Sequence, residues 1–209
     1  MSTGLFHEED WSGLVARASG WSRAAVELGA YTPAALDSVV AFLRRSRPSL
    51  GYLSLHLPFA VDHGGEERLV ERLVGLESHV AAVVQHPDVL MAPAMLAPLG
   101  RQLVLENMDV RKPGRDVAEL EPYFRVLPEA GLCLDVAHAK TIDPELKVAH
   151  ELLEVFGTRL RELHISGIDE QGNHLPLDAD AVDSFADVLR RCRGVPWILE
   201  SLPVDARPD

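Results

Sequence analysis

Seven residues that can bind a metal ion or move a proton recur along this sequence, each at the end of a short apolar run. The gaps between them are 29, 30, 20, 29, 29 and 36 residues, which suits one strand, one helix and two loops per step. Carboxylates and imidazoles hold divalent ions and pass protons near neutral pH. The sequence therefore predicts one chemical site built from Glu27, His56, His86, Glu106, Asp135, His164 and Glu200.

Four of these residues make one complete ligand set. Glu106, Asp135, His164 and Glu200 supply three carboxylates and one imidazole, a combination suited to Mn, Mg, Co or Zn. Taken singly, some of them have simpler explanations. Glu106 follows three apolar residues, so a buried salt bridge could neutralise it as well as a metal. Asp135 stands where the chain leaves a strand and could instead cap a helix.

Further histidines could bind further ions. His56 and His86 could hold a second ion with Glu106 as the bridge, and His138 and His174 could contribute to a third. Five of the nine histidines fall at or just past the end of a predicted strand, which random scattering does not usually produce. The expected cofactor is therefore one to three divalent ions.

Short apolar runs alternate with longer amphipathic segments almost throughout the chain. Parallel strands need such crossover segments between them, and strands buried on both faces are apolar along their length. The predicted strands are residues 24–28, 52–56, 81–86, 102–106, 132–135, 160–164 and 197–200. The predicted helices are residues 33–45, 66–79, 117–127, 144–156 and 179–191, with a weaker one at 92–99.

This alternation predicts an α/β fold, a TIM (β/α) barrel. A closed parallel barrel brings the carboxyl ends of its strands to one mouth, so all seven residues would meet there. An open doubly wound sheet usually has a Gly-rich first turn, and the sequence has none. Seven strands are one short of eight, and residues 5–21 resemble a helix, so the barrel lacks or replaces a strand at its N-terminus.

Composition limits the partners. The 209 residues are 47% hydrophobic and 25% charged, which is typical of one globular domain over residues 1–209. No apolar run is long enough to span a membrane and no signal peptide is evident, so we expect a cytoplasmic protein. A net charge of −12 opposes nucleic-acid binding. Cys133 and Cys192 suggest no disulfide framework, and the basic cluster of Arg111, Lys112 and Arg115 reads as a solvated loop more readily than as a binding patch.

Six short motifs, in order, resemble those of the xylose isomerase-like TIM-barrel superfamily, which includes endonuclease IV, sugar isomerases and epimerases. Each motif is weak alone, but six in this order are specific, and they cover nearly the whole chain from about residue 24 to residue 201. The motifs are Leu-His-Leu-Pro at 55–58, Gln-His-Pro-Asp at 85–88, Leu-Glu-Asn at 105–107, Leu-Asp-Val-Ala-His-Ala at 134–139, Leu-His-Ile-Ser at 163–166 and Ile-Leu-Glu-Ser at 198–201.

The resemblance implies roles for these residues. In that family the residues matching Glu106, Asp135, His164 and Glu200 bind the shared metal, and in the epimerases the two glutamates also move the substrate proton. In the endonuclease IV branch, four further histidines complete a trinuclear zinc site. They match His56, His86, His138 and His174.

One position departs from the pattern of the endonuclease IV branch. That branch has an aspartate two residues before its last histidine, where this chain has Gly172, so a third ion loses a ligand. We count Glu106, Glu200 and His138 as catalytic candidates. Three nearby residues are candidates for substrate binding, although the last is more readily explained as an exposed loop residue: Glu27, Asn107 and Lys140.

Three hypotheses about function follow. The first is a metal-dependent isomerase or epimerase of a small sugar-like or keto substrate, and the second is a multinuclear zinc phosphoesterase related to endonuclease IV. The chain is short and only 6% aromatic, which favours a small molecule over DNA. The third is a non-catalytic or partner-dependent barrel whose open edge a second subunit covers. Family analogy also suggests a homodimer.

Overall fold

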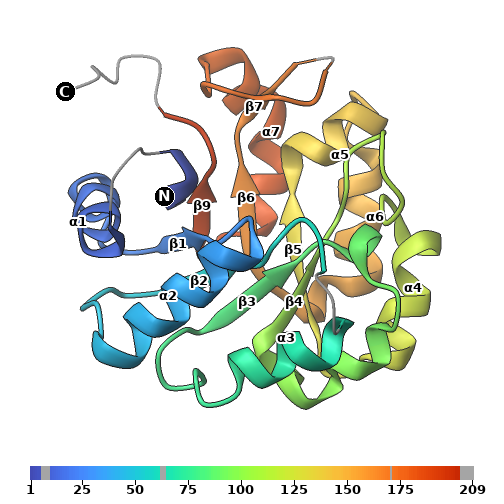
Figure 1. The fold of residues 1–209 in the computed structure, drawn as a ribbon. Coiled ribbons are helices and arrows are strands. Elements are labelled where there is room, and N and C mark those ends of the chain that lie inside the picture. Colours follow the sequence, from blue (N-terminus) through green and yellow to red (C-terminus); the bar gives the residue numbers. More distant parts are fainter. Residues whose placement is uncertain (6–9, 62–64, 170, 203–209) are drawn as a thin grey trace.

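Seven parallel strands form a nearly closed barrel in the computed structural model, which describes residues 1–5, 10–61, 65–169 and 171–202. The strands pair in chain order, as the predicted TIM barrel requires, and Figure 1 shows the helices arranged around them. A separate antiparallel pair, β7 (Gly167–Ile168) and β8 (His174–Leu175), lies outside the barrel sheet. The barrel strands are β1 (Val26–Gly29), β2 (Leu53–His56), β3 (Ala82–Gln85), β4 (Leu103–Glu106), β5 (Gly131–Asp135), β6 (Leu160–Ile165) and β9 (Trp197–Leu199).

The first residues of the chain bridge the gap between the two edge strands, β1 and β9. The backbone N–H of Ser2 donates to the carbonyl of Leu199 at 2.9 Å, and the N–H of Glu27 donates to the carbonyl of Met1 at 3.0 Å. The hydroxyl of Thr3 accepts the N–H of Gly29 at 2.9 Å. These residues occupy the edge that the sequence analysis left for a second subunit to cover.

The helices begin where the sequence supplies caps. Thr32 caps α2 (Pro33–Arg45) with a proline in its first turn, and aspartates 116 and 178 cap α4 (Val117–Val126) and α7 (Ala179–Arg191). The predicted helix over residues 5–21 appears as η1 (Thr3–Leu5) and α1 (Trp11–Trp21), and residues 6–9 lie outside the described residues.

Other helices differ from expectation for local reasons. The helix α3 (Gly65–Leu73) ends well before residue 79, because Gly75 has a left-handed φ of 89°. The segment over residues 92–99 belongs to a 3-10 stretch, η3 (Pro93–Gln102), which contains Pro98 and is kinked at Gly100, where φ is 51°. The predicted helix 144–156 is α6 (Lys147–Phe156), and it follows a short helix that the sequence did not predict, α5 (Val136–Ile142). The remaining 3-10 turns are η2 (Pro87–Val89) and η4 (Gly157–Arg159).

Two apolar clusters hold the barrel together. The larger one lies largely between the strands and the helices and includes Leu28, Leu55, Leu105 and Phe185. The smaller one consists of short side chains on β3, β4 and β5, partly covered by Tyr52. Because successive strand residues point to opposite faces, these short residues and the charged residues of the strand ends share the inside of the barrel. The members of the smaller cluster are Ala82, Val84, Val104 and Cys133.

No helix among the described residues is both long and apolar enough to cross a bilayer.

Candidate metal centre

Six of the seven predicted strand-end residues meet at one end of the barrel, as parallel strands require, whereas Glu27 is the second residue of β1 and lies deeper inside the barrel. Glu27, His56, Glu106, Asp135 and His164 lie on β1, β2, β4, β5 and β6, while two more directly follow β3 and β9. All seven except Glu200 have at most a few per cent of their surface exposed. The two that follow their strands are His86 and Glu200.

Four residues form the first candidate ligand set. One ligand atom from each of Glu106, Asp135, His164 and Glu200 lies within 4.8 Å of the others. The Nδ1 atom of His164 is 3.4 Å from Oε1 of Glu200 and 3.7 Å from Oε2 of Glu106. These separations leave room for an ion between the donors, since each donor would lie about 2 Å from it.

Asp135 has two roles in this set. Its Oδ1 caps α5 by accepting the N–H of His138 at 2.6 Å, and its Oδ2 has no hydrogen-bond partner among the described residues. The helix-cap explanation and the ligand explanation therefore apply to different oxygens of one carboxylate. The cap also explains why a helix begins directly after β5 and why His138 lies on that helix rather than in a loop.

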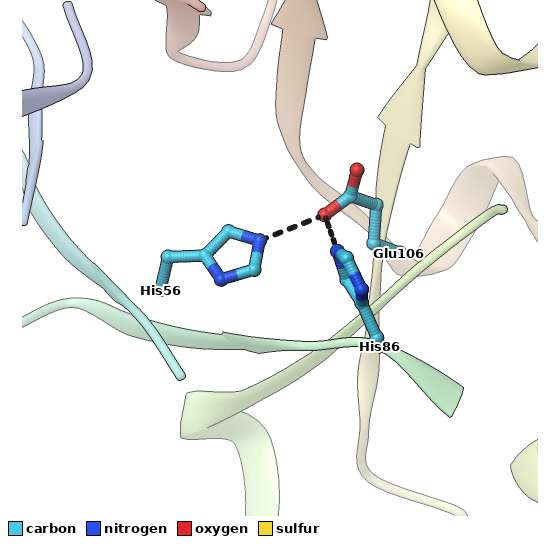
Figure 2. A group of neighbouring side chains, drawn as sticks. All are labelled: His56, His86 and Glu106. Atoms are coloured by element: carbon cyan, nitrogen blue, oxygen red, sulfur yellow. Dashed lines mark hydrogen bonds and ion pairs between the residues drawn. The ribbon is translucent and has the colours of Figure 1, made fainter. Parts of the chain in front are cut away.

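A second group shares Glu106 with the first. Figure 2 shows the imidazoles of His56 and His86 directed at the same oxygen of Glu106. The Nε2 atoms lie 3.2 Å and 3.4 Å from that oxygen, Oε2. A single carboxylate thus contacts the nitrogens of several imidazoles, which is the geometry expected of a bridging ligand.

The two remaining histidines lie farther out. His138 contacts Glu106 Oε1 at 3.2 Å through its Nδ1 atom, while the Nδ1 atom of His174 is 3.7 Å from Glu200 Oε2 and 2.7 Å from the hydroxyl of Ser166. Neither belongs to a group of three or more close ligand atoms among the described residues. The structure therefore brings six of the eight predicted ligands into tight sets and leaves these two at the margin.

The environment separates the two glutamates electrostatically. Burial alone would raise the pKa of Glu106, but the neighbouring histidines, led by His164 and His86, hold that pKa well below its usual range. Burial raises the pKa of Glu200 well above its usual range, and the charge of Glu106 adds to the effect despite nearby His164. The surroundings thus shift the pKa values of the two glutamates in opposite directions.

Neighbouring carboxylates raise the pKa of two of the histidines. Burial lowers the pKa of His56, but the hydrogen bond to Glu106 and the charge of Glu27 outweigh burial and raise it to about 9. Burial likewise opposes the charge of His138, yet Asp135 and Glu106 raise its pKa to about 10.

An open cavity of about 360 Å³ lies over these residues. That volume is in the range of small-molecule sites. Its wall includes the row of rings formed by Tyr31, Phe59 and His86, in which neighbouring rings stack with centroids 4.6 Å and 4.9 Å apart. Ligand residues on its surface are His56, His86, Glu106, His138, His174 and Glu200.

The three predicted substrate-binding residues do not line this cavity. Asn107 uses both atoms of its amide on the backbone of Asp135, at 2.8 Å and 3.0 Å. The ammonium of Lys140 is directed at α7, where it donates to Ser184 at 3.1 Å and lies 5.2 Å from the centre of the Phe185 ring. Glu27 lies inside the barrel, with its Oε2 at 3.1 Å from His164.

Comparison with known proteins gives matches of structure alone. No protein-family model matches the chain, and no curated protein matches it in sequence. The 3-keto-D-glucoside 4-epimerase YcjR from E. coli superposes with a TM-score of 0.63 at 14% identity, over 100% of this chain and 93% of that one. A xylose isomerase domain containing protein from Salmonella typhimurium LT2 gives 0.52 at 14%, over 87% and 79%. The chain has a TIM-barrel fold similar to that of these two proteins.

A third solved structure, of AsfvAP:AG, agrees with this assignment, with a TM-score of 0.56 at 9% identity over 98% of this chain and 90% of that one. At such identities the likeness concerns the fold. The fold expected from the six motifs is confirmed, and the chemistry of this xylose isomerase-like barrel has to be argued from its own side chains.

Sequence reasoning missed several residues of the site. Glu162 is fully buried inside the barrel, and its position two residues before His164 on β6 was the available signal, because such residues share a face of the strand. Tyr31 and Phe59 line the cavity from loops, where no periodic pattern marks them. Arg111 belonged to the basic cluster, but its partners, Asp109 and the backbone around Gly172, come from two different loops.

Proposed function

We propose that the protein is a metal-dependent isomerase or epimerase of a small polyhydroxylated or keto compound. The observation that carries the proposal is the set of Glu106, Asp135, His164 and Glu200, with ligand atoms within 4.8 Å of one another beneath an open cavity of about 360 Å³. Three carboxylates and an imidazole suit Mn, Mg, Co or Zn. A cavity of this size suits a sugar-like molecule.

Unpartnered buried atoms support a metal at this position. Among the described residues, Oδ2 of Asp135, Oε2 of Glu200 and both ring nitrogens of His164 are buried without a hydrogen-bond partner. Leaving such atoms unsatisfied costs several kcal/mol in total, about 1–3 kcal/mol each. A divalent ion held by the four residues would satisfy those of these atoms that face it. The Nε2 atom of His164 faces Glu27 instead.

The two glutamates supply the proton transfers. A bound divalent ion would hold adjacent oxygens of the substrate and polarise its carbonyl group. Glu106, kept ionised by the histidines, takes the proton from the carbon next to that carbonyl. Glu200 returns a proton to the carbon, and delivery to the opposite face inverts its configuration. The product has the same atoms as the substrate, as an epimerisation requires.

The first test is the metal content of protein purified without chelators or added metal. One exchangeable manganese, cobalt or magnesium ion per chain, measured by plasma mass spectrometry, is the result expected for the isomerase. If no ion binds even after reconstitution, the ligand assignment and the proposed activity are both wrong.

The second test follows the substrate proton. The metal-loaded protein is incubated in deuterium oxide with ketoses and 3-keto-glucosides, since a protein of the same fold is named as a 3-keto-D-glucoside 4-epimerase, and incorporation of deuterium is measured by NMR. Glu200→Gln should retain the metal and lose exchange by at least about 100-fold, as expected when a general acid–base group is removed. Full exchange in that variant would contradict the mechanism.

A second candidate function is supported by one specific group. His56 and His86 meet Glu106 at 3.2 Å and 3.4 Å, and a one-metal isomerase does not need them. With a second ion at this group, the centre could cleave a phosphoester by the chemistry of two neighbouring ions. Two or more zinc ions per chain, together with phosphodiesterase activity, would favour this alternative.

A further inference from the structure

A second layer of charged side chains lies inside the barrel, beneath the four candidate ligands. It consists of Glu27 on β1 and Glu162 on β6, which approach His164 from below, and all three residues are fully buried. Carboxylates in such a place are strongly destabilising unless a charged or hydrogen-bonding group faces them. Their position therefore needs a reason beyond packing.

His164 faces two carboxyl groups with each of its ring nitrogens. The Nε2 atom is 3.1 Å from Oε2 of Glu27 and 3.5 Å from Oε1 of Glu162. The Nδ1 atom is 3.4 Å from Glu200 and 3.7 Å from Glu106, on the side of the cavity. Carboxylates around Nε2 favour a proton on that nitrogen, which leaves the lone pair of Nδ1 directed at the candidate ion.

The two inner carboxylates are held differently. Glu162 is anchored by two hydroxyl groups from the neighbourhood of β2, since Ser54 donates to its Oε1 at 2.7 Å and Tyr52 donates to its Oε2 at 2.8 Å. Neither oxygen of Glu27 makes a hydrogen bond among the described residues. Its close ion-pair partner there is the imidazole of His164, at 3.1 Å, so Glu27 is directed at that ring.

We infer that Glu27 and Glu162 are positioning residues, which fix the ring orientation and the tautomer of His164 so that Nδ1 is presented to the metal ion. The inference rests on the proposed metal centre and replaces the substrate-binding role predicted for Glu27. Residues behind a metal-binding histidine commonly change metal affinity by about 10–100-fold when they are replaced.

The test compares Glu27→Gln and Glu162→Gln with the unaltered protein. Glutamine keeps the size of each side chain and removes its charge. Zinc affinity and the number of bound ions are measured by competition with a chromophoric chelator, on protein whose folding is checked by circular dichroism. We expect the same number of ions as in the unaltered protein and an affinity lower by about 10–100-fold.

Glu66→Gln is the matched control. Glu66 is also a buried carboxylate, but it accepts the backbone N–H groups of Met91 and Ala92 at the edge of η3, at 2.6 Å and 2.8 Å. It does not line the cavity, so this variant should bind zinc as the unaltered protein does.

A second measurement keeps the inference testable if the glutamine variants fail to fold. Tyr52→Phe removes one hydrogen bond from Glu162 and leaves every charge in place, so a smaller affinity loss of about 2–5-fold is expected from the loss of one bond. In parallel, nitrogen-15 NMR of the zinc-loaded protein should show the His164 proton on Nε2. A proton on Nδ1 would overturn the inference.

The outcomes separate this inference from the proposed function. Unchanged zinc affinity in both glutamine variants would overturn the positioning role and leave the metal centre intact. Loss of one bound ion in either variant would also overturn it, because the inner carboxylates would then be ligands themselves. Failure of the unaltered protein to bind any metal would instead contradict the metal centre.

Discussion

The guanidinium group of Arg111 occupies the space that a side chain at Gly172 would need. Gly172 has a φ of 77°, and a Cβ atom added there would overlap that guanidinium. Arg111 is held in place by both oxygens of Asp109, at 2.9 Å each, and it also contacts the carbonyl of Gly172. A carboxylate ligand for a third ion therefore has no room here, and a positive charge stands in its place. This arrangement favours one or two ions over three.

The contact between Arg111 and Gly172 predicts a non-additive pair of substitutions. Gly172→Ala should destabilise the protein by about 2 kcal/mol, through left-handed strain and overlap with Arg111. In an Arg111→Ala background the same substitution should cost about 1 kcal/mol less, because the overlap is gone. Urea unfolding measures both values. Gly157→Ala is the control, since Gly157 has a helical φ of −58° and open space at its Cβ; equal effects at both glycines would contradict the argument.

His86→Ala separates the two candidate chemistries. The imidazole of His86 contacts Glu106 at 3.4 Å and belongs to the second ligand group, but not to the first. Its removal should lower isomerase activity by less than about 10-fold, whereas it should abolish hydrolysis that depends on a second ion. His79→Ala is a suitable control because His79 is only half-buried and does not line the cavity. A complete loss of isomerase activity in His86→Ala would argue against a one-metal mechanism.

Metal affinity should rise with pH. The pKa of His56 is raised to about 9 and that of His138 to about 10, above the ordinary value for histidine, so both rings carry a proton at pH 7 in the absence of metal. Where an ion displaces one such proton, its affinity rises about tenfold per pH unit below that pKa. Calorimetry in buffers of different ionisation enthalpy counts the released protons. A pH-independent affinity between pH 6 and pH 8 would contradict this prediction.

The same shifts give the opposite trend for the stability of the metal-free protein. A raised pKa means that the folded state binds the proton more tightly than the unfolded state does, so the stabilisation is complete below about pH 6.5. It is lost as the pH rises through about 9 for His56 and about 10 for His138. Urea unfolding of chelator-treated protein should therefore show lower stability at pH 10 than at pH 7. Stability that rises over this range would show that the two rings are not held in the charged form.

Closure of the barrel by the first residues can be tested at Thr3. Its buried hydroxyl accepts the N–H of Gly29 at 2.9 Å, and Thr3→Val leaves that N–H without its partner. We expect a loss of about 1–3 kcal/mol in the free energy of unfolding. Thr158→Val, at an exposed position in η4, should change it by less than about 0.5 kcal/mol. Equal effects would mean that the bond does not help to close the barrel.

The sequence allowed the strands and most of the centre to be predicted, because each strand is a buried apolar run that ends in a polar residue. Glu106 and His164 show this well, since their strands are buried almost throughout and both side chains reach the site. Glu162 escaped notice because a glutamate inside a strand resembles a solvent-facing residue until its neighbours across the barrel are known.

Other features had no sequence signal at all. The bridge made by Met1 and Ser2 depends on backbone groups of Glu27 in β1 and Leu199 in β9, which lie far apart in the chain, so no local pattern reveals it. The helix α5 was hidden because its cap, Asp135, is also the last residue of β5. That residues 1–209 form one domain, that the protein forms a homodimer and that it works in the cytoplasm stay predictions.

The segment that seals the barrel is also part of the wall that a substrate would touch. Ser2 hydrogen-bonds to Leu199 through its backbone and to the Tyr31 hydroxyl through its side chain, at 3.2 Å, and Ser2, Gly4 and Leu5 all line the cavity. Changes that adapt this wall to a new molecule therefore also alter how firmly the barrel is shut. Divergence in substrate specificity at this part of the wall is therefore constrained by the need to keep the barrel folded.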